Sequence, residues 1–372
     1  MKILFTGDVN FRLFENFTKE TSEDILSDIL PYFNNSDFRI VNLECPLADI
    51  KKHKPIQKAG PNLICSPENI VFLNTANIDA VTLANNHIGD FGENAVKDTL
   101  DLLDENNILH SGAGKNIEYA YEPLRIEKDG ISVSVISVCE NEFGIAGEAE
   151  YGSAGYNPRF LLNRIRKEKA FGHKVVVVFH GGNEHNPLPS PDTVDRYRFI
   201  CDMGADALIA THTHCPQGYE IYNGKPIVYS MGNFIFQSDI KRKSRDSWFY
   251  GYISILNITD KVSLEIIPYK FNTEKTKITV FDGDDKIKMM SYIDELSKII
   301  QNQKELELYF SGWSWLHQWY PRIGGGFGDY NLVSCEAHNS QLKSIAKIYA
   351  YEKTDDIEYW SKKIKELQNM PV

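Results

Sequence analysis

The sequence lacks three features that each indicate a particular class of protein. It has no long Lys/Arg cluster and carries a net charge of −11, so the basic surface of a nucleic-acid-binding protein is missing. No apolar run approaches the roughly 20 residues that a membrane-spanning helix needs. The six cysteines are scattered without a C-x-x-C pair, which is typical of reduced thiols and excludes a disulfide framework. We therefore expect no nucleic-acid partner and no transmembrane segment.

The amino terminus, MKILFTGDVN, has too few apolar residues for the core of a signal peptide, because Asp8 interrupts the run. We therefore expect a cytoplasmic protein whose cysteines stay reduced. The sequence contains neither an internal repeat nor a low-complexity tract, and it does not indicate the oligomeric state.

The residues that are present are typical of a globular protein, with 42% hydrophobic and 24% charged side chains among 372 residues. Strand-like and helix-like segments alternate nearly throughout residues 1–236, which predicts an α/β fold with buried sheets. Residues 248–281 have the pattern of consecutive strands, and the chain is mostly helical from about residue 284. We therefore predict a main domain over residues 1–272 and a mostly helical extension over residues 273–372 that packs on it.

An aromatic, glycine-rich stretch from Trp313 to Tyr330 shows no clear period. It is either a lid on the substrate side or a hydrophobic plug that ties the C-terminal helices to the main domain. We favour the plug, because aromatic side chains bury large areas.

Five apolar strands of the predicted fold end in acidic, amide or imidazole side chains. Ligands of open α/β sheets bind at the carboxyl ends of the strands, so these side chains are expected to lie at one edge. Imidazole and carboxylate together suit zinc, manganese or iron, and asparagine adds a neutral oxygen. Each residue has a local alternative as a turn, cap or core residue, but one metal site accounts for all five strands. Strand by strand, the residues are Asp8 and Asn10; Asn42 and Glu44; Asn85, Asn86, His87 and Asp90; His180, Glu184 and His185; and His212 and His214.

The stretch LIATHTHCPQG places His212 and His214 two residues apart where a strand should end. If the strand persists through Thr213, both rings lie on the same side of it, about 7 Å apart along the backbone. They can then converge on one or two metal ions. Alternatively, one histidine caps the strand and the other is solvated. The polar ends of the other strands favour the metal site.

These residues resemble the CapA, or PGA_cap, family of poly-γ-glutamate capsule-synthesis proteins, which is similar to the calcineurin-like metallophosphoesterases. The resemblance implies a four-layer α/β/β/α sandwich of two mixed sheets flanked by helices. It covers roughly residues 1–237 in the family's order. The similar stretches are FTGDVNF, VNLECPL, VTLANNHIGDFGE, the region of SGAGKN, FHGGNEH and GADALIATHTHCPQGYEIYNGKPIVYSMGNF.

The resemblance also implies a site for two divalent ions of manganese, iron or zinc, bridged by Glu44. One ion would be bound through His212, and the other through His214. Asn10 stands where the related motif has a histidine, so the ion bound through His214 is expected to be the weaker one. The implied ligands are Asp8, Asn10, Glu44 and His214 for one ion, and Glu44, Asn86, His180 and His212 for the other.

The expected activity is that of a metal-dependent hydrolase that cleaves a phosphoester in capsule or exopolymer biosynthesis. The substrate would be a small molecule or a polymer such as poly-γ-glutamate or a polysaccharide. His87, Asp90 and Glu184 are the candidate catalytic residues: His87 would protonate the leaving group, and Glu184 would orient a ligand histidine. Two alternatives stay open. One is a γ-glutamyl amide hydrolase or transferase, and the other is a non-enzymatic accessory protein of capsule assembly with a degraded metal site.

Overall fold

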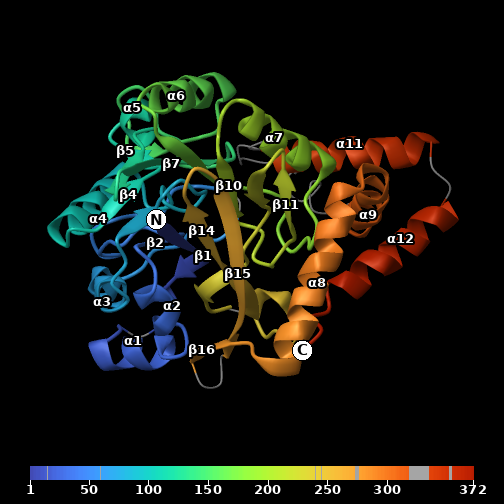
Figure 1. Cartoon of the computed structure of the whole chain (residues 1–372), viewed down its shortest axis with the longest axis horizontal. Coiled ribbons are helices and arrows are strands. Elements are labelled where there is room, and N and C mark those ends of the chain that lie inside the picture. Colours follow the sequence, from blue (N-terminus) through green and yellow to red (C-terminus); the bar gives the residue numbers. More distant parts are fainter. Residues whose placement is uncertain are drawn as a thin grey trace.

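Two mixed β-sheets lie face to face at the centre of the molecule (Figure 1). The computed structural model describes residues 1–14, 16–58, 60–238, 240–243, 245–272, 276–317, 335–351 and 354–372. The first sheet contains, in spatial order, β16 (Lys277–Val280), β15 (Val262–Asn272), β14 (Tyr250–Ile258), β1 (Lys2–Asn10), β2 (Phe38–Leu43), β3 (Ala80–Thr82) and β4 (Leu109–Ser111), and β13 (Asn233–Phe236) also pairs with β1. The second contains β11 (Tyr219–Tyr222), β12 (Lys225–Val228), β10 (Ala207–Thr211), β9 (Lys174–His180), β7 (Ile131–Cys139) and β6 (Leu124–Lys128).

In the first sheet the parallel strands form one side, which ends at β4, and the antiparallel strands form the other; in the second sheet the parallel strands lie at the centre between the antiparallel edge strands β11 and β6. β1, β2, β3 and β4 pair in parallel in the first sheet, as do β7, β9, β10 and β12 in the second. The sequence of β9 is typical of a central strand that is covered on both faces. It reads KVVVVFH, and six of its seven residues are buried. A short third sheet joins β5 (Ala113–Gly114) and β8 (Gly152–Ser153).

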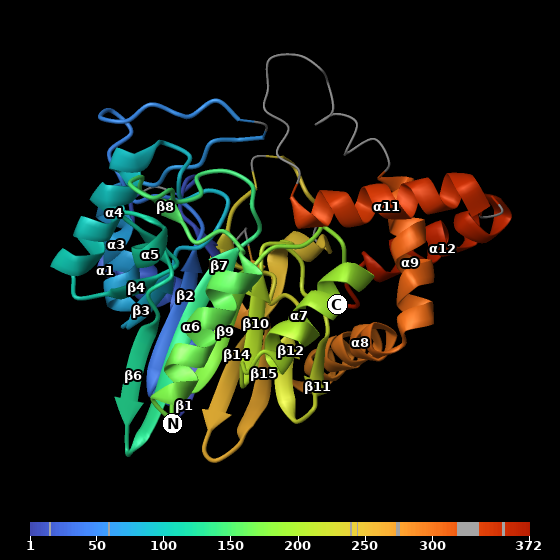
Figure 2. The ribbon, with the colours of Figure 1, turned by 90° about the horizontal axis from the view of Figure 1, so that it is seen from above.

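Helices cover the outer faces of both sheets, which confirms the predicted sandwich with its helical C-terminal part (Figures 1 and 2). Capping residues set where several helices begin. Asn157 accepts hydrogen bonds from the backbone amides of Arg159 and Phe160, and Ser190 accepts one from the amide of Thr193. The helices of the main part are α1 (Lys19–Leu26), α2 (Leu30–Asn34), α3 (Ile70–Thr75), α4 (Glu93–Glu105), α5 (Ile117–Ala120), α6 (Pro158–Ala170) and α7 (Pro191–Asp202).

The C-terminal helices gather on one side of the sandwich, away from α3 and α4 (Figure 2). They are α8 (Gly283–Gln301), α9 (Gln303–Leu316), α11 (Glu336–Tyr351) and α12 (Thr354–Leu367). The Oγ of Ser297 on α8 accepts a hydrogen bond from the amide of Tyr219 at 2.9 Å, and α12 packs on α9. Residues 313–316 of the aromatic stretch form the end of α9, so that part is helical. Residues 318–330 of the stretch, and with them the choice between a lid and a plug, lie outside the described residues.

Candidate metal centre

The candidate centre lies where β1, β2, β9 and β10 end, between the two sheets. Asp8 is fully buried near the end of β1, at a register shift in the pairing of β1 with β13. Its Oδ1 accepts a hydrogen bond from Asn42 Nδ2 at 2.7 Å, and its Oδ2 accepts one from the backbone amide of His212 at 3.0 Å. Asp8 therefore connects β1 in the first sheet with the loop after β10 in the second.

The strand that leads to the paired histidines ends earlier than the sequence indicated. β10 stops at Thr211, and His212 and His214 lie in the following loop with backbone φ angles of 99° and 56°. The expectation that strand alternation aligns the two rings was therefore wrong. Left-handed backbone is strained for residues with a Cβ, and hydrogen bonds such as that from the His185 amide to the Thr213 carbonyl hold it here. The two rings nevertheless lie near each other, with centroids 6.1 Å apart.

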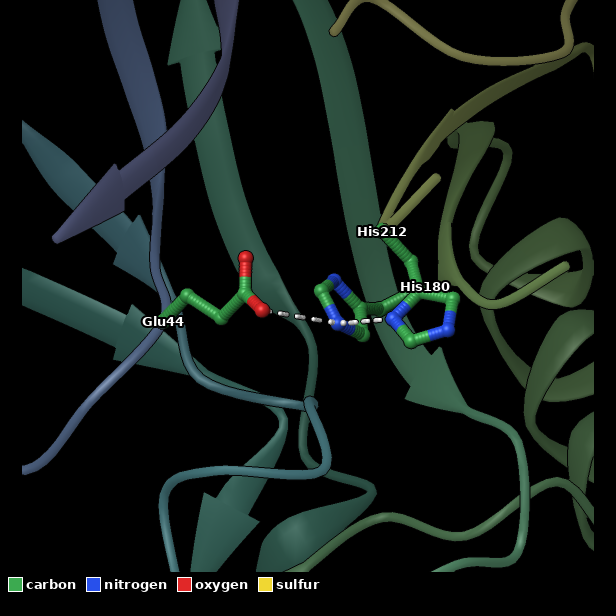
Figure 3. Close-up of side chains that lie close together, drawn as sticks. All are labelled: Glu44, His180 and His212. Carbon is green, nitrogen blue, oxygen red and sulfur yellow. Dashed lines mark hydrogen bonds and ion pairs between the residues drawn. The ribbon is translucent and has the colours of Figure 1, made fainter. Parts of the chain in front are cut away.

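One group of possible metal ligands consists of Glu44, His180 and His212 (Figure 3). His180 Nε2 lies 3.8 Å from Glu44 Oε1 and 3.1 Å from His212 Nδ1. Asn86 Oδ1 lies 3.1 Å from the same His180 nitrogen. The structure thus brings an amide oxygen to this group as well.

A second group consists of Asp8, Glu44 and His214, so the two groups share Glu44. His214 Nδ1 lies 3.7 Å from Asp8 Oδ2, and His214 Nε2 lies 3.7 Å from Glu44 Oε1. Within each group the ligand atoms are all within 4.8 Å of one another. Two adjacent groups that share one carboxylate are the arrangement expected of a dinuclear site.

The bonding of Glu44 tests whether these residues suit a cation. Both of its carboxylate oxygens are buried, and neither has a hydrogen-bond partner among the described residues. Burial, and then the nearby charge of Asp8, raises the pKa of Glu44 well above its usual range, and burial raises the pKa of Asp8 to about 7. No described lysine or arginine forms an ion pair with either carboxylate. A divalent ion would supply the missing positive charge, so the residues fit one.

The histidines are also in the form that binds metal. Burial lowers the pKa values of His180 and His214 well below the usual range and that of His212 to about 4, so all three are neutral near pH 7. Thr211 Oγ1 lies 2.9 Å from His180 Nδ1, and Asn233 Oδ1 lies 2.9 Å from His214 Nδ1. Such contacts fix the orientation of ligand rings.

Comparison with known proteins identifies the family. The family model described as "Bacterial capsule synthesis protein PGA_cap" matches residues 2–238. The chain belongs to the PGA_cap family. It is 30% identical over 236 residues to the capsule biosynthesis protein CapA of Bacillus anthracis, a match that covers 61% of this chain and 57% of that protein. It is 29% identical over 299 residues to the PGA biosynthesis protein CapA of Bacillus subtilis (strain 168), with 79% and 77% covered.

The chain therefore spans little more than half of the length of the Bacillus anthracis relative. Among solved structures, a hypothetical protein from Thermus thermophilus matches with 15% sequence identity and a TM-score of 0.45, over 76% of this chain and 100% of that one. In the described part of this PGA_cap family member, no helix is both long and apolar enough to cross a lipid bilayer. The six cysteines are all buried and unpaired.

Asn10 does not extend the candidate ligand set of this family member. Its Nδ2 donates a hydrogen bond to the Glu44 carbonyl at 3.1 Å, and its Oδ1 accepts one from the Arg12 amide at 2.9 Å. The side chain therefore anchors the backbone next to Glu44, and its oxygen is directed to the Arg12 amide. The sequence placed Asn10 among the ligands because a related motif has a histidine there, but the register shift after Asp8 changes the environment of the following residues.

His87 and Asp90 form a buried pair next to the candidate ligands. Asp90 Oδ2 lies 2.7 Å from His87 Nδ1, while His87 Nε2 lies 3.9 Å from Glu44 Oε1 and so faces the centre. Burial lowers the pKa of His87, and hydrogen bonding to Asp90 opposes that effect. Lys58, which the sequence interpretation did not consider, lies 2.5 Å from Asp90 Oδ1 and 3.1 Å from His87 Nδ1. Lys58 is thus the cation nearest to this pair.

Glu184 lies in the wall of a cavity of about 200 Å³ that opens beside His212. Its carboxylate forms no hydrogen bond to any described histidine, so its expected role in orienting a ligand ring has no support in the geometry. Burial, and then the charge of Glu142, raises the pKa of Glu184 to about 7. The other residues of the wall are Glu142, Gly182, Asn183, His185, His212, Trp313, His317, Ala337 and His338.

Two asparagines to which the sequence interpretation gave no role support the centre. Asn42 contacts both Asp8 and His180, and Asn233 contacts His214. Asn42 had been noted at a strand end, and Asn233 lies in the quoted segment YSMGNF, so both were visible as polar residues next to apolar strands. Their roles depend on contacts between the two sheets, which spacing along the chain does not reveal.

Proposed function

We propose that this protein is a metal-dependent hydrolase with a dinuclear centre. One ion would be held by Asp8, Glu44 and His214, and the other by Glu44, Asn86, His180 and His212. The observation that carries the proposal is Glu44, which belongs to both ligand groups and whose two buried oxygens have no hydrogen-bond partner in the described part of the chain. A buried carboxylate without a partner is strongly unfavourable unless a cation binds it.

Bound divalent ions would polarise an ester or amide and make water more acidic. The chain's own residues supply the remaining requirements. His87 Nε2 faces the centre and can deliver a proton to a leaving group, while Asp90 at Nδ1 holds the ring in that orientation. Lys58 forms an ion pair with Asp90 next to the histidine, so the charge of this buried carboxylate has a partner.

We propose a phosphoester as the bond cleaved, in the synthesis of a capsule or exopolymer. One line of support is the similarity to capsule biosynthesis proteins. The other is electrostatic: this acidic protein would repel a phosphate, and the two cations of the proposed centre would attract it. The name of the Bacillus subtilis relative, a PGA biosynthesis protein, favours a second candidate. Poly-γ-glutamate is linked by amides, and dinuclear centres also cleave amides.

Metal content measured beside two activities tests these proposals. The purified chain, loaded in turn with Mn²⁺, Fe²⁺ or Zn²⁺, would be assayed on an aryl phosphate and on a γ-glutamyl oligomer. Phosphatase activity that disappears in His212→Ala but persists in His110→Ala supports the phosphoester. His110 is a suitable control, because it pairs with Asp104 near the surface, outside the centre. Cleavage of the oligomer alone supports the amide, and the absence of bound metal overturns both and leaves an accessory role.

A further inference from the structure

A second cluster of metal-binding side chains lies outside the centre described above. It consists of Glu142, Cys335 and His338, whose ligand atoms are within 4.8 Å of one another. Glu142 lies in the loop after β7, whereas Cys335 and His338 lie at the start of α11, beyond the residues matched by the family model. Cys335 and His338 are three positions apart, so one helical turn can present both to the same ion.

Three hydrogen bonds fix the start of α11 against the loop that carries Glu142, and a fourth connects it to the loop after β9. Glu336 accepts two of them from Asn141, from the backbone amide at 3.2 Å and from Nδ2 at 2.9 Å. The Ala337 amide donates to Glu140 Oε2 at 3.3 Å, and the Ala337 carbonyl accepts from Asn183 Nδ2 at 3.2 Å. The cluster is therefore held in place by hydrogen bonds on both sides of its ligands.

The ligand types in the cluster indicate which ion it would bind. Thiolate, imidazole and carboxylate are the three ligand types that zinc combines in proteins, and three protein ligands leave a fourth position open. Glu142 and His338 line the cavity beside His212, so the open position would lie on the cavity side. Cys335 itself is 1% exposed, and burial raises the pKa of its thiol, which does not suit a nucleophilic cysteine.

We propose that Glu142, Cys335 and His338 form a separate zinc site that connects the C-terminal helices to the wall of the cavity. Metal binding would displace the thiol proton of Cys335. Its cation would offset the negative charge that Glu142 and Glu184 bring to the wall. If the proposed hydrolase function holds, the open position would bind an anionic group of the substrate, a carboxylate or a phosphate, while the scissile bond lies at the dinuclear centre.

Cobalt substitution in the full chain tests the site directly. Co²⁺ bound to a thiolate gives a charge-transfer band in the near ultraviolet, and the proposed ligands of the dinuclear centre include no cysteine, so that centre does not give the band. We expect the band in the unaltered protein, its loss in Cys335→Ala and its weakening in Glu142→Gln. Cys201→Ala is the matched control, because Cys201 is equally buried but lies on α7 outside the cluster.

Metal counting completes the experiment. Cys335→Ala and His338→Ala should each bind one zinc ion fewer than the unaltered chain, and His338→Ala provides the answer if Cys335→Ala does not fold. The proposal is overturned if the cobalt-loaded protein shows no band, if Cys335→Ala retains it, or if zinc does not protect Cys335 from alkylation. If the unaltered, metal-loaded protein shows the band but no hydrolase activity, this site is retained and the proposed function is rejected.

Discussion

At the scale of single residues, the two ligand groups differ in the number of atoms they offer. The group around His212 includes the Asn86 oxygen in addition to Glu44 and His180, whereas the group around His214 has only Asp8 and Glu44 beside it. More ligands generally hold an ion more tightly. The weaker site is therefore expected at His214, as the sequence also indicated. The reason differs: the sequence argument rested on Asn10 as a poor ligand, whereas in the structure Asn86 strengthens the other group.

We predict that His212→Ala removes the tighter ion and that His214→Ala mainly lowers the occupancy of the weaker one. His87→Ala should leave both ions bound and slow turnover by roughly 10²–10⁴-fold, because His87 holds its Nδ1 toward Asp90 and only its Nε2 toward the centre. Metal content and turnover would be measured on the same preparations. If His87→Ala lost metal as completely as His212→Ala, His87 would be a ligand and its assignment as the proton donor would be wrong.

Glu184 gives a pH-dependent prediction. The pKa of this carboxyl group is raised to about 7 in the folded chain by burial and then by Glu142, against 4.5 ordinarily. The folded state therefore binds more protons than the unfolded state between pH 4.5 and 7, so the group's contribution to stability falls as the pH rises through that window. Glu184→Gln should raise the stability at pH 8 by on the order of 1 kcal/mol and leave it nearly unchanged at pH 4. Urea unfolding at the two pH values measures this, and an equal effect at both would refute it.

The candidate ligands could be predicted from the sequence to a large extent. Residues such as Asp8 and His180 follow apolar strands, and strand ends in this class of fold converge on one edge. The side-chain geometry could not be predicted. Asn10 turns to the backbone next to Glu44, and Lys58 reaches Asp90 from a segment with no regular pattern. Such contacts join residues that are distant in the sequence, so no local pattern records them.

At the scale of elements, β1 carries Asp8 at a point where the sheet is irregular. A Cβ on Gly7 would lie 1.7 Å from the Gly232 carbonyl oxygen, and that oxygen accepts a hydrogen bond from the Asp8 amide. The close approach of β1 and the turn before β13 therefore requires glycine at position 7 and sets the position of Asp8.

We predict that Gly7→Ala destabilises the fold by more than about 3 kcal/mol and lowers metal binding in any protein that still folds. Gly130→Ala is the matched control: Gly130 has a φ of 75° with nothing within 4 Å, so only the left-handed backbone penalises the alanine, by about 1–2 kcal/mol. Denaturant midpoints of the two variants give the comparison. A Gly7→Ala protein as stable as Gly130→Ala would show that β1 can shift without loss.

The long elements β9 and α4 form where the sequence pattern predicts them, whereas the short strand β10 ends before its pattern does. The apolar run of β9 and the helical spacing of α4 are strong local signals, because each buries one continuous face. β10 instead ends at Thr211, although the pattern continues to His214. Hydrogen bonds from the other sheet, such as that between Asp8 and the His212 amide, override the local preference there.

At the scale of the whole molecule, the C-terminal helices are part of the candidate site. Trp313 and His317 from the end of α9, and His338 from α11, line the cavity beside His212. The Gln368 side chain donates a hydrogen bond to the His185 carbonyl at 3.1 Å, next to the same cavity. The site is therefore assembled from both sheets and from the end of the chain, and its shape depends on the docking of α8 and the helices that follow.

This dependence predicts that the C-terminal helices and the sandwich unfold together. Ile293 on α8 is fully buried, whereas Ile287 on the same helix is 64% exposed. Ile293→Ala should lower the stability of the entire chain by about 2–4 kcal/mol through the cavity it leaves, and Ile287→Ala by under about 0.5 kcal/mol. Calorimetry should show one transition that Ile293→Ala moves as a whole, and metal binding should protect all of it. If Ile293→Ala instead split the transition in two and left the metal-protected part at its original temperature, the helices would be a separate domain and would not determine the shape of the site.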